Sequence, residues 1–169
     1  MCARHVSSES VWRDPRIRGL NLRYGPTLPR REVDVYMRLG STTGFEMDSY
    51  NPDTSPTPTD WLRTDEGDRI ELVSAFHRRK KIQLPNAQLH AVIHVVVENQ
   101  LALGEETVVK TLSRLQGEGL SRHDAIHAIG SVLAENLYEM MQGDASTGAP
   151  YQRYLERLKR LTAKNWRAG

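Results

Sequence analysis

The sequence contains a single cysteine, few aromatic residues and no long apolar run, and these shortages exclude several classes of protein. Cys2 stands alone, so the chain can form neither an internal disulfide nor a cysteine-based zinc site. This composition fits a reducing compartment, and we expect a cytoplasmic protein. The first ten residues lack the apolar core of a secretion signal, and the most apolar stretch, residues 91–97, is too short to span a bilayer. We therefore expect no membrane contact.

Charge is unevenly distributed along the 169 residues, although the net charge is only +2. Residues 12–31 contain six arginines and one acid, residues 32–75 contain ten acids and three arginines, and residues 150–169 contain six basic residues and one acid. Such blocks either pair with each other or form interaction surfaces. Binding of nucleic acid through the basic ends is one interpretation, but no nucleic-acid motif accompanies them, and a solvated surface explains them more simply.

Periodicity divides the chain into two parts. Residues 1–58 are weakly periodic and rich in proline, which predicts an irregular N-terminal arm. Residues 59–169 predict a helical domain, so we expect an all-α bundle of about five helices. Asn86 and Ser121 are the expected N-caps of two of these helices. The predicted helices cover approximately residues 65–80, 86–103, 105–117 and 121–142, and a last helix begins near residue 150.

Two pairs of histidines at helical spacing are the strongest functional signal. His90 and His94 lie in a helix that is otherwise almost wholly apolar, and His123 and His127 repeat the spacing in a second helix. Residues four apart share one face of a helix, so each pair can reach one metal ion. Because a buried polar group without a partner costs ~1–3 kcal/mol, these imidazoles need partners. The sequence predicts a divalent metal site, zinc or iron, formed by all four histidines.

An up-down-up arrangement of consecutive helices would bring the two pairs together. In that topology helices 86–103 and 121–142 run parallel, and their histidines interleave in height above the N-caps. Glu98 and Glu135 then also lie at a similar height. These two carboxylates are candidates for the acid or base in metal-assisted hydrolysis or redox chemistry. Alternatively, they orient the histidines or pair with polar neighbours.

Other interpretations of the histidines stay open at this point. The four rings can form a metal-free core held by hydrogen bonds, as in a non-catalytic interaction or scaffold protein, or they can ligate a haem. The stretch 123-HDAIHAIG-130 also resembles the H-E-x-x-H-x-x-G pattern of zinc proteases. Against a protease, Asp124 replaces the glutamate, and Leu133 stands where the third histidine is required. Beyond the metal, the expected partner is a small molecule or another protein.

The segments 84-LPNAQLHAVIHVVVENQLALGE-105 and 123-HDAIHAIGSVLAENLYE-139 resemble a bacterial domain family of unknown function. Members of that family share a P-N-x-x-L-H-x-x-x-H helix followed by an E-N-Q or E-x-Q stretch, and a second H-x-x-x-H helix with a later L-x-E. The resemblance covers about residues 60–142 and implies a helical domain without an established activity. The matching positions in this chain are Pro85, Asn86, His90, His94, Glu98, Gln100, His123, His127 and Glu135.

Overall fold

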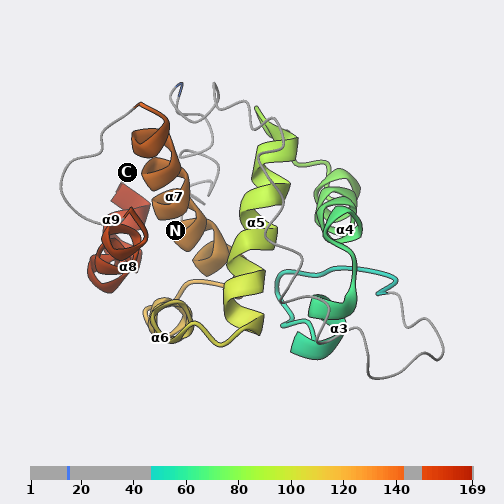
Figure 1. The fold of residues 1–169 in the computed structure, drawn as a ribbon, viewed down its shortest axis with the longest axis horizontal. Helices are drawn as coiled ribbons and strands as arrows, with labels where there is room; N and C mark the ends of the chain where they lie inside the picture. Colours follow the sequence, from blue (N-terminus) through green and yellow to red (C-terminus); the bar gives the residue numbers. More distant parts are fainter. Residues whose placement is uncertain (1–14, 16–46, 143–149, 169) are drawn as a thin grey trace, which may run out of the picture.

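The computed structural model describes residues 47–142 and 150–168, together with residue 15 (Figure 1). These residues form helices and no strand, which confirms the predicted all-α fold. Most of the predicted N-terminal arm, residues 1–58, lies outside the described residues. The helices are α3 (Pro58–Arg63), α4 (Glu66–Arg79), α5 (Ala87–Ala102), α6 (Glu106–Gly117), α7 (Arg122–Met141), α8 (Pro150–Arg160) and α9 (Ala163–Ala168).

The helices that carry the paired histidines begin at the N-caps expected from the sequence. The side-chain oxygens of Asn86 and Ser121 each accept a hydrogen bond of 3.0 Å from the backbone N–H three residues further on. One turn joins α5 to α6 and a second joins α6 to α7. Each contains a glycine in the left-handed backbone conformation, which other residues rarely adopt. Gly104 has a φ of 74° and Gly119 a φ of 88°. These turns allow α6 to leave the direction of α5, and α7 to leave the direction of α6.

α5 and α7 lie side by side in the middle of the molecule, with α4 on the other side of α5 and α8 beside α7 (Figure 1). The predicted parallel arrangement of α5 and α7 is wrong. Arg122, the first residue of α7, contacts Glu98 near the end of α5, whereas His127 contacts His90 near the start of α5. The two helices are therefore antiparallel. The prediction assumed that α6 returns alongside α5, but α6 is seen end-on in Figure 1 and runs across the ends of both helices.

α5 is buried on almost every side because it presents a different stripe of residues to each neighbour. One stripe joins the apolar cluster shared with α6, α7 and α8, through Leu89, Ile93 and Val97. A second joins the apolar cluster on the side of α3 and α4, through Ala91 and Val95. The third stripe is polar and at most 1% exposed, and it consists of His90, His94 and Glu98. Each stripe repeats every four residues, so a helix can carry all three without conflict.

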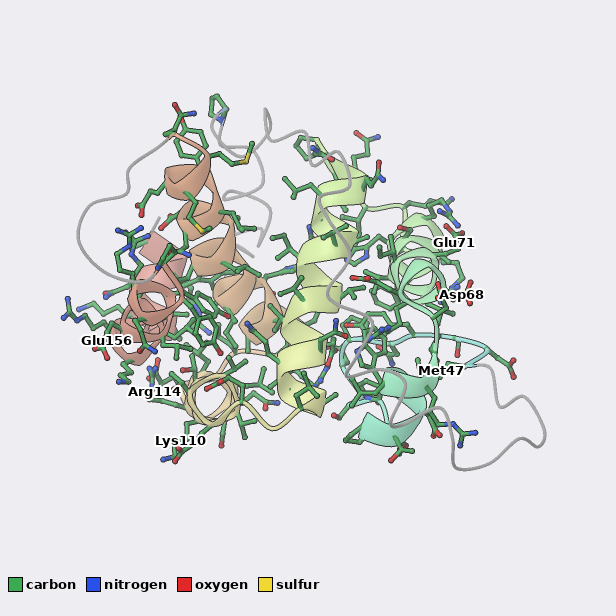
Figure 2. The ribbon with its side chains drawn as sticks, in the orientation of Figure 1. Met47, Asp68, Glu71, Lys110, Arg114 and Glu156 are labelled. Atoms are coloured by element: carbon green, nitrogen blue, oxygen red, sulfur yellow. The ribbon has the colours of Figure 1, made fainter. Side chains whose placement is uncertain are left out.

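Most charged side chains of the described residues lie on the exterior of the bundle. Asp68 and Glu71 extend from the side of α4 that faces away from α5 (Figure 2). On the opposite side of the molecule, Arg114 of α6 donates a hydrogen bond of 3.0 Å to the carbonyl oxygen of Leu158 and so holds α8 in place. No helix within residues 47–142 or 150–168 combines the length and the apolar character needed to cross a bilayer.

A matched pair of leucine substitutions tests the assignment of the core. Leu115→Ala should lower the free energy of unfolding by about 2–5 kcal/mol, because Leu115 is fully buried between α6 and its neighbours. Leu103→Ala makes the same chemical change at a side chain that is 72% exposed, and we expect a change within about 0.5 kcal/mol. Urea unfolding followed by circular dichroism measures both. Equal effects of the two substitutions would contradict the assignment.

Candidate metal centre

Five histidines from three helices lie together between α4, α5 and α7. The α5 ring of His90 lies 4.5 Å from that of His77 on α4 and 4.9 Å from that of His127 on α7, between ring centroids. His94, one turn further along α5, lies 5.0 Å from His77 and 4.9 Å from His127. His123 lies 4.2 Å from His127. The structure thus brings together the four histidines identified in the sequence, and adds His77.

Four of these rings form a tighter set. One nitrogen from each of His77, His90, His94 and His127 lies within 4.8 Å of the others, and all four side chains are buried. The Nε2 atom of His90 lies 3.0 Å from that of His77 and 3.3 Å from that of His127. Ligand nitrogens around a tetrahedral zinc ion, with bonds of about 2.0–2.1 Å, are separated by about 3.3–3.4 Å. The two His90 contacts are close to this separation, and the four nitrogens lie near enough to one another that they could hold a metal ion.

Hydrogen bonds to the outer nitrogens determine which nitrogens can face an ion. His77 Nδ1 lies 2.9 Å from the carbonyl oxygen of Val73, which can only accept, so the hydrogen of the neutral ring is on Nδ1. Its Nε2 then carries a lone pair, which is directed into the cluster. Metal-ligating histidines commonly donate their other N–H to a backbone carbonyl in this way.

His94 is oriented by a buried chain of polar side chains. Its Nδ1 lies 3.4 Å from the hydroxyl oxygen of Tyr50, and that hydroxyl donates to Glu98 at 2.8 Å. Because the Tyr50 hydrogen is used by Glu98, its oxygen accepts from His94 Nδ1–H, which leaves Nε2 of His94 as the lone pair. Both carboxylate oxygens of Glu98 accept from the Arg122 guanidinium at 2.7 Å, and Arg122 also donates to the Pro52 carbonyl at 2.8 Å. The chain thus connects α5 to α7 and to the segment before α3.

Burial sets the protonation of these groups. It lowers the pKa of His94 and His127 well below the usual value, and nearby histidines lower it further. The pKa of His123 falls to about 4, first through burial and then through His77. Burial and then Glu98 raise the pKa of Tyr50, so its phenol stays protonated. Neutral imidazoles at neutral pH are the form that binds metal ions.

Neutral rings can make both contacts of His90 Nε2 only by sharing one hydrogen. An imidazole nitrogen carries either a hydrogen or a lone pair, never both. If His90 Nε2 accepts from His127, it presents a lone pair to the lone pair of His77 at 3.0 Å. If it donates to His77, the same hydrogen must also serve the contact with His127, as a three-centre bond. A cation among the rings removes this competition, because every converging nitrogen then donates its lone pair to the same ion.

The remaining candidate residues occupy different positions. His123 is half-buried and lies outside the tight set, and its Nε2 is buried without a hydrogen-bond partner among the described residues. Glu98 lies beside the cluster, but its carboxylate is occupied by Arg122 and Tyr50 and serves to position His94. Glu135 is exposed, about two turns beyond His127 on α7. The expectation that the two glutamates lie at one height depended on parallel helices and is wrong.

Sequence reasoning missed two residues of the centre, His77 and Tyr50. His77 begins the basic segment 77-HRRKK-81, a pattern typical of a helix end in water. Its position four residues after Val73 and seven after Ile70 places it on the apolar face of α4, and that spacing was the signal available. Tyr50 precedes the proline-rich loop, in a non-helical stretch without periodicity, and no pattern in the sequence marks it as buried.

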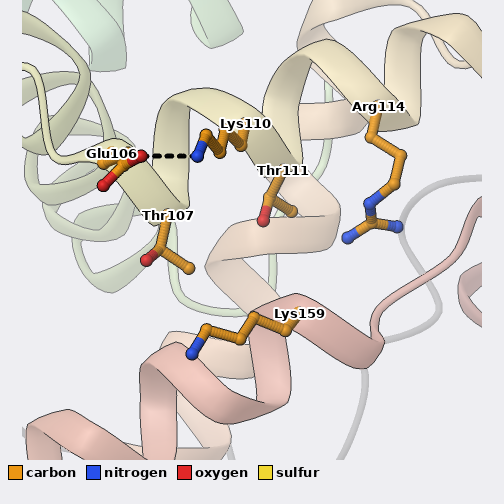
Figure 3. Close-up of a pocket in the computed structure, with 6 residues that line it drawn as sticks. All are labelled: Glu106, Thr107, Lys110, Thr111, Arg114 and Lys159. Atoms are coloured by element: carbon orange, nitrogen blue, oxygen red, sulfur yellow. Dashed lines mark hydrogen bonds and ion pairs between the residues drawn. The ribbon is translucent and has the colours of Figure 1, made fainter.

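Elsewhere, the charged surface offers no comparable grouping in the described part of the chain. A hollow between α6 and α8 is lined by Glu106, Thr107, Lys110, Thr111, Arg114 and Lys159 (Figure 3). Its cations already have partners, since Lys110 pairs with Glu106 and Lys159 with Glu156. In the basic C-terminal segment, Arg157 pairs with Glu139 at 2.8 Å. The arginine-rich residues 12–31 lie outside the described residues, except residue 15.

Acidification should destabilise the metal-free protein. The folded-state pKa of His94 and His127 lies well below 6.5 and that of His123 is about 4, so below pH 6.5 the unfolded chain binds more protons than the fold. The contribution of the neutral rings to the free energy of unfolding is fully present above about pH 7. It falls from pH 6.5 toward 4, with a slope of roughly 1.4 kcal/mol per pH unit for each histidine that stays neutral in the fold. Thermal unfolding from pH 8 to 4 measures this. A melting temperature that is constant between pH 7 and 5 would contradict the burial of neutral rings.

The buried ion pair should be far more sensitive to substitution than a surface pair. Arg122→Met leaves the Glu98 carboxylate buried without its cation, and should cost about 3–5 kcal/mol in urea unfolding. The double substitution Arg122→Met/Glu98→Gln removes both charges and should recover part of that loss. Arg157→Met breaks the partly exposed pair with Glu139 and should cost at most about 1 kcal/mol. If the double variant is as unstable as the single one, the pair does not act as a unit.

No family model matches the chain, and no curated protein or solved structure matches it either.

Proposed function

We propose that this protein binds one divalent transition-metal ion, zinc or iron, through His77, His90, His94 and His127. The observation that carries the proposal is the convergence of Nε2 atoms on His90, at 3.0 and 3.3 Å, where neutral rings would have to share a single hydrogen between the two contacts. Imidazole ligands suit zinc, iron, copper and nickel. The contacts of His77 with Val73 and of His94 with Tyr50 support the proposal, because outer hydrogen bonds of this kind orient metal-binding histidines.

The centre acts mainly as a structural element in this proposal. Structural metal sites are closed by protein ligands, whereas catalytic sites keep one position open for water or substrate. The four histidines are between 0% and 5% exposed, and four nitrogens complete a tetrahedral shell. The carboxylate nearest to them, Glu98, is held by Arg122 and Tyr50 and so is not free to accept a proton. These features favour stabilisation of the fold over metal-assisted hydrolysis or redox chemistry.

Elemental analysis of the purified protein, never exposed to chelator, tests the proposal. Wild type should contain about one equivalent of metal, and His90→Ala/His127→Ala should lose it, because both substituted rings belong to the tight set. His77→Ala should weaken binding as well, which distinguishes this centre from one formed by the α5 and α7 pairs alone. At a free ion concentration of 100 times Kd, binding should add about 2.7 kcal/mol to the free energy of unfolding.

The control is Glu135→Gln, at an exposed residue of α7 outside the centre. It should retain the metal content and the melting temperature of wild type. Wild-type protein that contains no metal, and whose melting temperature does not respond to added Zn²⁺ or Fe²⁺, would overturn the proposal. The metal-free core of hydrogen-bonded histidines would then be the better interpretation.

A further inference from the structure

The fifth histidine occupies a position that the four-histidine centre does not explain. The ring of His123 lies 4.2 Å from that of His127, 5.3 Å from that of His94 and 5.4 Å from that of His77, between centroids. It therefore touches three of the four rings of the tight set without belonging to it. Its Nε2 is buried and has no hydrogen-bond partner among the described residues.

Exposure separates His123 from the other four histidines. His77, His90, His94 and His127 are buried, whereas His123 is half-buried. An ion arriving from water must exchange its hydration shell for protein ligands before it reaches the closed centre. A ligand that is partly exposed on one side and adjoins three centre rings on the other suits such an exchange, because the ion is never left without a donor.

The charges around His123 also favour the approach of a cation. Asp53, which is exposed, and Asp124, which is half-buried, both act electrostatically on the His123 ring in the sense that stabilises positive charge. The nearby cation Arg122 acts in the opposite sense, but its guanidinium is engaged by the Glu98 carboxylate. Carboxylates near a binding position raise the local concentration of cations and so increase association rates.

We propose that His123 is the loading ligand of the metal centre: it binds an incoming divalent ion at the rim and transfers it to His127 and His94. This inference rests on the proposed metal-binding function and assigns a path to it. Transfer is a ligand exchange, in which a bond from the ion to the His123 imidazole, the partly exposed residue of the cluster, is replaced by a bond to a nitrogen of the tight set. A ligand that acts only along the path lowers the barrier in both directions. It therefore speeds uptake and release equally, and leaves the equilibrium affinity unchanged.

Co²⁺ is a suitable probe, because its visible absorption reports binding directly. Uptake is followed by stopped-flow mixing of Co²⁺ with metal-free protein, and release by mixing the Co²⁺ form with excess chelator. His123→Ala should slow both by roughly ten-fold, which corresponds to a barrier higher by about 1.4 kcal/mol, while Kd stays within about three-fold of wild type. His123→Gln retains more of the side-chain volume and should show the same kinetic change if His123→Ala is poorly folded.

A pair of charge variants completes the experiment. Asp53→Asn should slow uptake at low salt, and high salt should remove the difference, because exposed charges are screened. Asp68→Asn makes the same change on the outer side of α4 and should leave the uptake rate unchanged (Figure 2).

Each other outcome overturns the inference. If His123→Ala and His123→Gln bind and release Co²⁺ at wild-type rates, His123 is not on the path. If they weaken Kd by more than ten-fold, with faster release and unchanged uptake, His123 is a fifth ligand of the centre. If wild-type protein does not bind Co²⁺, Zn²⁺ or Fe²⁺, the metal-binding proposal itself is wrong. This outcome is distinguishable from the others because it is measured on wild type before any variant is made.

Discussion

Burying imidazoles between three helices is favourable only if their nitrogens find partners, and this requirement shapes the surrounding structure. Val73 supplies a carbonyl to His77, and Tyr50 supplies an oxygen to His94. With these outer contacts made, neutral rings can make both inner contacts of His90 only by sharing one hydrogen between His77 and His127. Protonation would supply more hydrogens, but burial lowers the pKa of the rings and disfavours it. The proposed metal ion would satisfy all of the converging lone pairs together.

The polar chain beside the centre explains why so apolar a helix retains a charged residue. Glu98 continues the stripe of His90 and His94 along α5, and it is as deeply buried as they are. Its charge is balanced by Arg122, and its remaining hydrogen bond comes from Tyr50. The same three side chains attach α7 and the segment around Pro52 to α5. The arrangement that orients one candidate ligand therefore also holds the start of the helical domain against its middle.

The prediction that the two histidine pairs meet in one site had a sound physical basis, since polar residues on a buried face need partners. The sequence predicted the wrong direction for α7, because nothing in residues 103–121 specifies that α6 crosses the ends of its neighbours. The pairs meet nevertheless, because four-residue spacing produces a continuous stripe whichever way the second helix runs. His77 was missed because it begins a basic run that is typical of a solvated helix end. Arg122 was missed as the partner of Glu98, because their contact depends on the antiparallel arrangement.

The chain carries one cysteine and so has no covalent means of joining distant segments to each other. His77 on α4 and His127 on α7 lie far apart in sequence, and their nitrogens both lie within the tight set. An ion held by both would act as a cross-link that closes the loop between them in the unfolded chain. By the chain-entropy relation used for disulfides, closing a loop of this length is worth about 4 kcal/mol. In a compartment where thiols stay reduced, a metal ion bound by histidines would then cross-link distant segments of the chain, as disulfides do in secreted proteins.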